Sequence, residues 1–242
     1  LHCMKMVNTT SNTLKLTAIS VAVAMLLSGC NGDDGKDGID GAAGMDGADG
    51  SNGAPGLPQG QFLIANNGES NSGTVSLVDQ NANTLETLTT GANEGVVFTQ
   101  TGSVVQAGDS DTPLLRTLCS LSSSTSGMYS ADADTEISGA NTGLTNPKGI
   151  AVANDAGIIF AADFTGMRIS IFGSQAAGDV APVAEIVTAA QPWDVAFDED
   201  SDRLFVALTD GTIAVYDDVI ASEFAPTVTR TIVPSDSDGN QI

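Results

Sequence analysis

Histidine is nearly missing from this chain, and that scarcity narrows the chemistry open to it. His2 is the single histidine. His2 lies in the N-terminal segment that is interpreted below as a signal peptide, and without it Ser-His-Asp and Cys-His nucleophile systems, and zinc or copper sites with histidine ligands, lack the histidine they need. Any metal site must therefore use oxygen ligands, and calcium is the natural ion for an acidic protein.

Basic residues are also scarce. Eight Lys and Arg stand against 30 Asp and Glu, which gives a formal net charge of −22 at pH 7. A phosphate backbone binds to a basic face, and this chain has too few cations to form one. The composition therefore argues against a nucleic-acid partner.

The apolar run near the N-terminus is too short to cross a membrane. Leu16 to Leu27 is uncharged and mostly apolar, whereas a spanning helix needs about 20 such residues. It follows Lys5 and Lys15, and it ends at Leu27-Ser28-Gly29-Cys30, as the h-region of an export signal does. The stretch resembles a bacterial lipoprotein signal peptide, and a plain secretory signal with an incidental cysteine is the alternative.

The lipoprotein resemblance implies a signal peptide over residues 1–29, cleavage before Cys30, and lipidation of Cys30. Acyl chains on this cysteine would hold the protein to a membrane, because each buried methylene contributes about 0.8 kcal/mol. Asn31 stands where many inner-membrane lipoproteins carry aspartate, so the resemblance favours the outer membrane of a bacterial cell envelope. Lys5 and Lys15 leave with the signal, so six basic residues remain against 30 acidic ones, a net charge of −24.

Cysteine is as scarce as histidine, with three in the chain. Cys3 would leave with the signal and Cys30 would be acylated, so Cys119 is expected to have no intrachain partner. The sequence therefore does not predict a disulfide scaffold, and Cys119 is read as a small buried residue or as a reactive thiol.

Residues 30–60 form a predicted stalk with glycine at every third position. Nine Gly-x-y triplets run from Gly32 to Pro58, as in a collagen triple helix, where only glycine fits at the crowded axis. Aspartates fill many of the third positions, and their repulsion opposes the close approach of three chains. A homotrimeric triple helix and a flexible tether both remain open.

Residues 61–242 contain short β-rich runs that repeat. The run Pro147-Lys148-Gly149-Ile150-Ala151-Val152 is echoed by Pro192-Trp193-Asp194-Val195-Ala196-Phe197, and Phe160 is echoed by Phe205. Both offsets are 45 residues, the span of one four-stranded propeller blade. A fainter copy begins at Gly95, and the run from Phe62 matches only the second and third strands of the unit.

The repeat resembles the NHL family of β-propellers, and more loosely the gluconolactonase-type ones. The resemblance lies in the Pro-x-Gly-Ile-Ala-Val opening at Pro147, the Asp155-Ala156-Gly157 turn, the Ala162-Asp163 pair and the Arg168-Ile169 pair. It implies an all-β propeller of four-stranded blades, with about four visible and a six-bladed parent. Asp163 and Arg168 are expected to bridge a hairpin rather than to act in catalysis. The chain begins with Leu1 and lacks a closing strand before Ile242, so we expect a fragment of the longer propeller.

Carboxylates and amides supply the candidate ligand residues. Glu94 and Asn146 precede predicted inner strands, and Asp194 lies within one. Side chains of these types at the mouths of several blades could bind a ligand or a calcium ion.

Two further features concern the last blade. Asp198, Asp200 and Asp202 alternate like the start of a calcium loop, but Arg203 replaces the expected glycine, so a solvated hairpin tip is the alternative. Trp193 is expected to pack between blades, although a place at the propeller mouth would let it stack on a sugar.

Two functions fit these features. The first is a lipid-anchored surface module whose propeller binds a protein or polysaccharide without catalysis. The second, implied by the gluconolactonase-type resemblance, is a calcium-dependent lactonase, which needs no histidine. We favour the first.

Overall fold

The computed structural model describes residues 60–67, 73–91, 93–108, 111–119, 121 and 134–241. The predicted signal peptide, Cys30 and almost all of the stalk lie outside these ranges and stay predictions. Within these ranges, no helix has the length and apolar character needed to cross a membrane.

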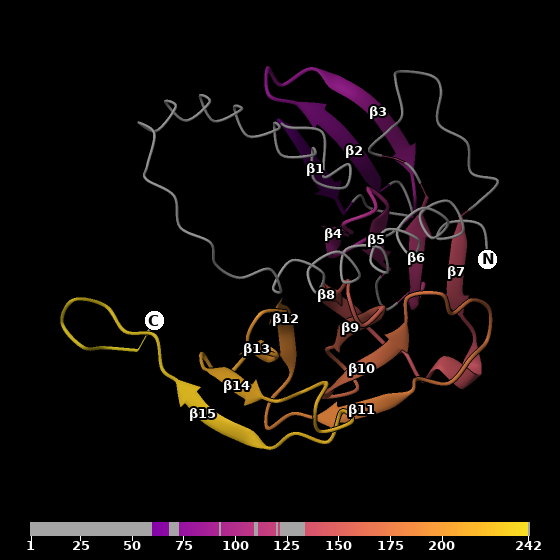
Figure 1. Cartoon of the computed structure of the whole chain (residues 1–242). Coiled ribbons are helices and arrows are strands. Elements are labelled where there is room, and N and C mark those ends of the chain that lie inside the picture. Colours follow the sequence, from indigo (N-terminus) through magenta and orange to yellow (C-terminus); the bar gives the residue numbers. More distant parts are fainter. Residues whose placement is uncertain are drawn as a thin grey trace, which may run out of the picture.

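Four antiparallel sheets follow one another in chain order along an open arc (Figure 1). The first has three strands: β1 (Gln61–Asn66), β2 (Thr74–Asp79) and β3 (Thr84–Thr89). The second has four: β4 (Val96–Phe98), β5 (Val104–Ala107), β6 (Leu114–Leu118) and β7 (Thr135–Ser138). A 3-10 turn, η4 (Ala140–Thr142), follows β7.

The third and fourth sheets have the same four-stranded order. The third contains β8 (Pro147–Ala153), β9 (Ile158–Asp163), β10 (Arg168–Gly173) and β11 (Ala184–Val187). The fourth contains β12 (Pro192–Asp198), β13 (Arg203–Leu208), β14 (Ile213–Asp217) and β15 (Val228–Ile232). Each sheet is a meander in which every strand pairs with its neighbour in sequence.

Contacts between sheets identify each strand's place in a blade. The first strand of one sheet packs against the second strand of the sheet before it, as β8 does on β5 and β12 on β9. In the same way β4 packs on β1, so β1 occupies a second-strand position. The prediction that this run matches the second and third strands of the unit is confirmed. The fold is an all-β propeller of four-stranded blades, as predicted.

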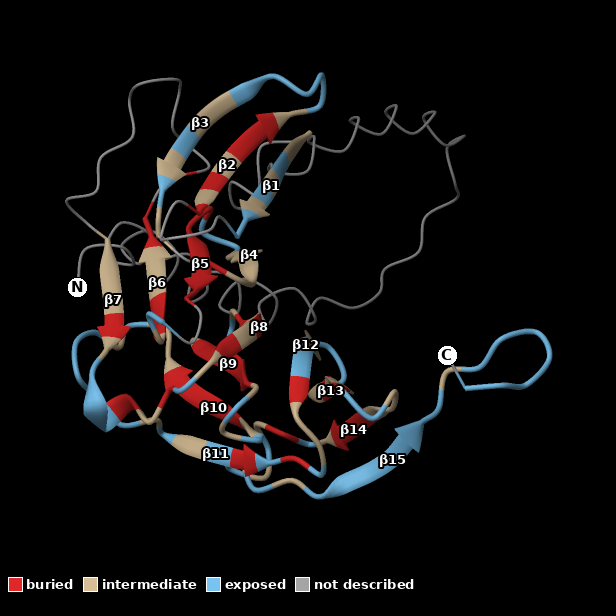
Figure 2. Cartoon of the chain, turned by 180° about the vertical axis from the view of Figure 1, so that it is seen from behind, coloured by how far each residue is buried: buried red, intermediate tan, exposed pale blue. Residues whose placement is uncertain are grey.

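The core lies between successive sheets because strand residues alternate between two faces. In β9, Ile159 and Ala161 join the apolar cluster shared with the second sheet, whereas Phe160 and Ala162 join the cluster shared with the fourth. Full burial of a side chain such as Phe160 contributes about 1.5–3 kcal/mol. Figure 2 shows the buried residues along the middle strands, whereas β15 is exposed along its length.

Glycines let the inner strands approach one another closely. A Cβ on Gly149 would lie 2.6 Å from the Cα of Asp194, and a Cβ on Gly95 would lie 2.6 Å from the carbonyl oxygen of Lys148. Gly95 also donates its amide hydrogen to that Lys148 oxygen. The glycine that opens each inner strand thus packs directly on the first residues of the next inner strand.

One of the predictions about Cys119 is wrong. Its side chain is buried at the end of β6, as one reading expected. However, it carries a disulfide, so the expectation that it has no intrachain partner is wrong. The other cysteines of the sequence, Cys3 and Cys30, both lie outside the described residues.

Candidate functional site

Three side chains at equivalent positions of successive inner strands form a row, which we call the mouth row: Glu94, Lys148 and Trp193. Each precedes the position held by Gly95, Gly149 or Asp194. Because those positions pack on the next inner strand, the residues before them lie side by side at one end of the propeller. The row thus joins a carboxylate, an ammonium group and an indole across three blades.

The members of the mouth row contact one another in order. The Lys148 Nζ donates to the Glu94 Oε1 at 2.5 Å, and it lies 5.5 Å from the centre of the Trp193 ring. The Asn67 side-chain amide also donates to the Glu94 Oε1, at 3.1 Å. The Lys148 and Glu94 side chains are 15% and 19% exposed, so this ion pair is partly shielded from water.

Trp193 contacts the neighbouring blade at the propeller mouth but is not buried between blades. It is 55% exposed, and the ring of Phe164 meets it edge-on, with ring centres 5.7 Å apart. Phe164 comes from the turn after β9, and Trp193 from the start of β12, so the two rings join the third and fourth blades. An exposed indole held by a second ring and a cation presents a rigid apolar surface.

Asp163 anchors the chain that carries the row. Its buried carboxylate accepts hydrogen bonds from the Asn146 amide at 2.8 Å and from the Thr145 hydroxyl at 2.6 Å. It also pairs with Arg168 at 3.2 Å, which is its partner across the β9–β10 hairpin. The predicted hairpin bridge is confirmed, and through it the loop before β8 is fixed in place.

Asn146 lies beside the mouth row. Its carbonyl oxygen accepts from the amide of Phe164, the residue whose ring contacts Trp193. Its side-chain oxygen is buried and has no hydrogen-bond partner. A buried acceptor without a donor is uncommon in a native fold.

Asp194 lies beside the mouth row, against Gly149, but is not a member of it. Its side chain is exposed, and its Oδ1 accepts from the amide of Val195 at 2.8 Å. Asp194 replaces the glycine of the earlier copies, and it lines a hollow on the outer face of the fourth sheet together with Ala196, Phe205 and Ile213.

The three alternating aspartates serve the β12–β13 hairpin and its neighbours. The Ser201 hydroxyl donates to Asp198 at 2.6 Å, and Asp200 is exposed. Both oxygens of Asp202 accept backbone amides, from Ile220 at 2.8 Å and Ala221 at 2.9 Å. In the part of the chain that the structure describes, no three His, Cys, Asp or Glu side chains gather as metal ligands.

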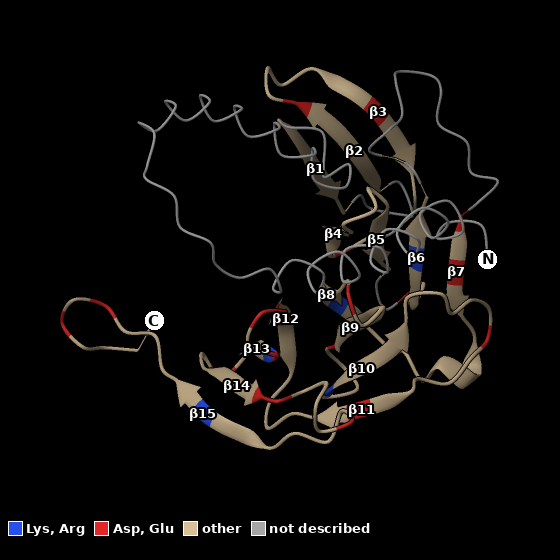
Figure 3. Ribbon diagram, viewed as in Figure 1, with Lys and Arg blue, Asp and Glu red and all other residues tan. Residues whose placement is uncertain are grey.

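Positive charge is spread thinly over the described sheets. Figure 3 shows Lys and Arg at isolated positions on β6, β8, β10, β13 and β15. Lys148 is therefore the cation that the mouth row offers, and Glu94 already neutralises it.

Sequence reasoning found Glu94 and Asn146 but missed Lys148 and Phe164. The repeat could have revealed Lys148, because when the three copies are aligned it occupies the same position as Glu94 and Trp193. Phe164 is not part of the repeat pattern, since it belongs to the turn after the Ala162-Asp163 pair.

Comparisons with known proteins reveal likeness of fold alone. No known protein family and no curated protein matches the sequence. A protein of unknown function from Desulfotomaculum acetoxidans superimposes with a TM-score of 0.53 at 14% identity, over 71% of this chain and 52% of its own. One of unknown function from Bacteroides caccae superimposes with a TM-score of 0.54 at 12% identity, over 76% of this chain and 60% of its own.

The dihydro-heme d1 dehydrogenase NirN aligns with a TM-score of 0.48 at 15% identity, over 73% of this chain and 35% of its own. The chain therefore spans between about a third and three fifths of the length of these three structures.

Proposed function

We propose that this protein is a non-enzymatic binding module whose propeller recognises a carbohydrate or protein partner at the mouth row. The observation that carries the proposal is Trp193, a large aromatic side chain left 55% exposed beside a charged pair. An indole in this setting offers an apolar face, and fixed polar groups around it supply orientation.

A sugar fits this chemistry better than a purely apolar ligand. The ring face of a hexose can stack on Trp193, while its hydroxyls reach polar atoms that both donate and accept. Glu94 retains free lone pairs, and Lys148 retains N–H groups. Carbohydrate is therefore the favoured partner class, and protein the other.

The net charge of the chain indicates which class of glycan is the expected ligand. With a net charge of −22, the protein repels anionic polymers at low ionic strength. The expected ligand is thus a neutral glycan, whose affinity changes little with salt because no net charge is neutralised on binding.

Support for the lactonase alternative is weaker. Such an enzyme needs carboxylates directed at a calcium ion. Glu94, the candidate carboxylate of the mouth row, instead accepts hydrogen bonds from Lys148 and Asn67. We therefore carry the binding proposal forward.

We also infer from the sequence that Cys30 is lipidated and that the stalk holds the propeller away from an outer membrane. The stalk is proposed as a spacer that trimerises or acts as a single tether. Lipid analysis of Cys30 tests this inference directly.

A glycan array tests the binding proposal. The purified full-length protein should bind one or more neutral glycans, and Trp193→Ala should weaken that binding at least tenfold, as truncation of a central aromatic contact does. Phe62→Ala is the matched control because Phe62 is also an exposed aromatic, 58% exposed, but lies on β1 in the first sheet. Retention of glycan binding by Trp193→Ala, or equal loss in both variants, would contradict the proposal.

A further inference from the structure

A cavity of about 340 Å³ lies between the third and fourth blades, away from the mouth row. Phe197, which lines it, comes four residues after Trp193 in β12. At about 3.3 Å per strand residue, roughly 13 Å of backbone separates the two. The cavity and the mouth row therefore lie toward opposite ends of the propeller.

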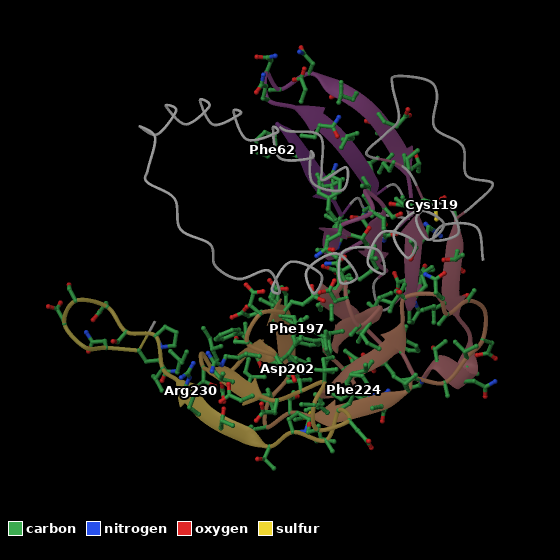
Figure 4. The ribbon with its side chains drawn as sticks, in the orientation of Figure 1. Phe62, Cys119, Phe197, Asp202, Phe224 and Arg230 are labelled. Atoms are coloured by element: carbon green, nitrogen blue, oxygen red, sulfur yellow. The ribbon has the colours of Figure 1, made fainter. Side chains whose placement is uncertain are left out.

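The cavity has apolar walls and an acidic rim. Ala153, Phe197 and Ile220 supply apolar surface, and Asp155, Glu199 and Asp202 supply the carboxylates. Figure 4 places Phe197 and Asp202 close together in the region of the last two sheets.

Hydrogen bonds hold two of these carboxylates in position. Asp202 accepts from the amides of Ile220 and Ala221, which fixes it against the segment after β14. The Glu199 Oε1 accepts from the amide of Asp155 at 2.6 Å, which joins the β12–β13 turn to the β8–β9 turn. Each carboxylate still has lone pairs for another donor.

One lining residue, Asp202, and two residues of the segment after β14 adopt a backbone conformation that costs free energy. Asp202, Asp218 and Phe224 have φ values of 49°, 56° and 63°, in the left-handed region that side chains disfavour. Such residues cost of order 1–3 kcal/mol each and persist only where the surroundings hold them. Phe197, Ile220 and Phe224 all pack against the same buried apolar cluster, which holds two lining residues and the segment after β14 in place.

Among the described residues, the three rim carboxylates have no Lys or Arg partner. The ion pairs of this part of the chain join Arg116 to Glu136, Lys148 to Glu94, Arg168 to Asp163 and Glu185, and Arg203 to Asp217. Arg203 follows Asp202 directly but pairs with Asp217 across the β13–β14 hairpin. Three carboxylates of like charge therefore surround an apolar cavity without a balancing cation.

We propose that this cavity binds a small organic cation, with an ammonium group on an aromatic or aliphatic body. The body would fill the space against Phe197 and Ile220, and the ammonium would donate to Glu199, Asp155 or Asp202. The volume lies at the lower end of the roughly 300–1,000 Å³ of small-molecule sites. Calcium fits less well, because it takes six to eight oxygen ligands and most of the lining residues are apolar.

Three probes of one shape and different charge test the inference: 2-phenylethylamine, 2-phenylethanol and 3-phenylpropionate. Isothermal titration of the full-length protein at pH 7 should give a dissociation constant for the amine at least tenfold below those for the alcohol and the acid. Equal affinity for all three, or no binding of the amine, would overturn the inference.

Variants then locate the binding. Glu199→Gln removes a charge but keeps the oxygen that accepts from Asp155, and it should weaken amine binding about tenfold. Asp200→Asn is the matched control, since it removes a charge from the same turn without lining the cavity, and it should leave the affinity within twofold.

Ala221→Phe offers a second approach that does not change the charge. Ala221 is an exposed lining residue, so a larger side chain can occupy the cavity without entering the core, and amine binding should be lost. Unchanged amine affinity in both Glu199→Gln and Ala221→Phe, each with wild-type circular dichroism, would overturn the inference.

Discussion

At the scale of the residue, one buried charge fixes the end of the propeller that carries the mouth row. Asp163 is the one acidic side chain classed as buried in the described chain, and it is fully enclosed. Arg168 pairs with it and also with Glu185, which is 40% exposed. The same guanidinium thus makes one buried and one solvated ion pair. Removing each carboxylate in turn therefore compares the stability contribution of a buried pair with that of a solvated pair.

Asp163→Ala should lower the free energy of unfolding by about 3–5 kcal/mol. The reason is that it leaves Arg168 and the amide of Asn146 without their buried acceptor. Glu185→Ala should lower it by less than about 1 kcal/mol, because that pair is solvated. Urea denaturation followed by circular dichroism measures both, and similar losses in the two variants would contradict the assigned roles.

A surface pair predicts a pH dependence. The hydrogen bond from Arg203 holds the pKa of Asp217 below its ordinary value of 3.8. The pair therefore stabilises the folded state at neutral pH, and this contribution is lost as the pH falls below 3.8, where the unfolded state takes up the proton first. The stability difference between wild type and Asp217→Asn should be smaller at pH 3 than at pH 7, as urea denaturation at both values would measure. A larger difference at pH 3 would contradict this assignment.

At the scale of the element, the inner strands depend on glycine where they touch. Gly149→Ala should destabilise the protein by about 1–3 kcal/mol, because the new Cβ would meet the backbone of Asp194. Gly173→Ala in β10 is the control, since a Cβ there meets nothing within 4 Å and the change should be neutral or slightly stabilising. Thermal unfolding measures both, and a fully stable Gly149→Ala would mean that the inner strands are not in contact.

Repeat spacing predicted the inner three strands of the third and fourth blades because their apolar residues alternate and recur after 45 residues. The outermost strands, β7, β11 and β15, were not identified individually. They carry little apolar pattern, since they lie at sheet edges, and β15 is exposed throughout.

The candidate site was only partly predictable for a related reason. Trp193 was expected inside because large aromatic residues are buried on average. Trp193 is exposed because it occupies the position of the repeat that lies at the propeller mouth. Glu94 could be named from the sequence, but its pairing with Lys148 required the packing of two inner strands.

At the scale of the whole molecule, we propose that a membrane anchor and a spacer precede the propeller. Wild-type protein expressed in a bacterium with lipoprotein-processing enzymes should incorporate radiolabelled palmitate, and Cys30→Ala should not, because the thioether needs that sulfur. Label that fails to enter the wild type, or that enters Cys30→Ala equally, would remove the anchor and leave a secreted propeller.

Binding of a glycan at the mouth row should be visible in the fluorescence of Trp193, because it is the single tryptophan of the chain. Intrinsic fluorescence should be titrated with a neutral oligosaccharide that the array identifies. We predict a saturable shift of the emission to shorter wavelength and protection from acrylamide quenching, since a stacked sugar would displace water from the exposed indole. An unchanged emission spectrum and unchanged quenching at saturating oligosaccharide would contradict the account.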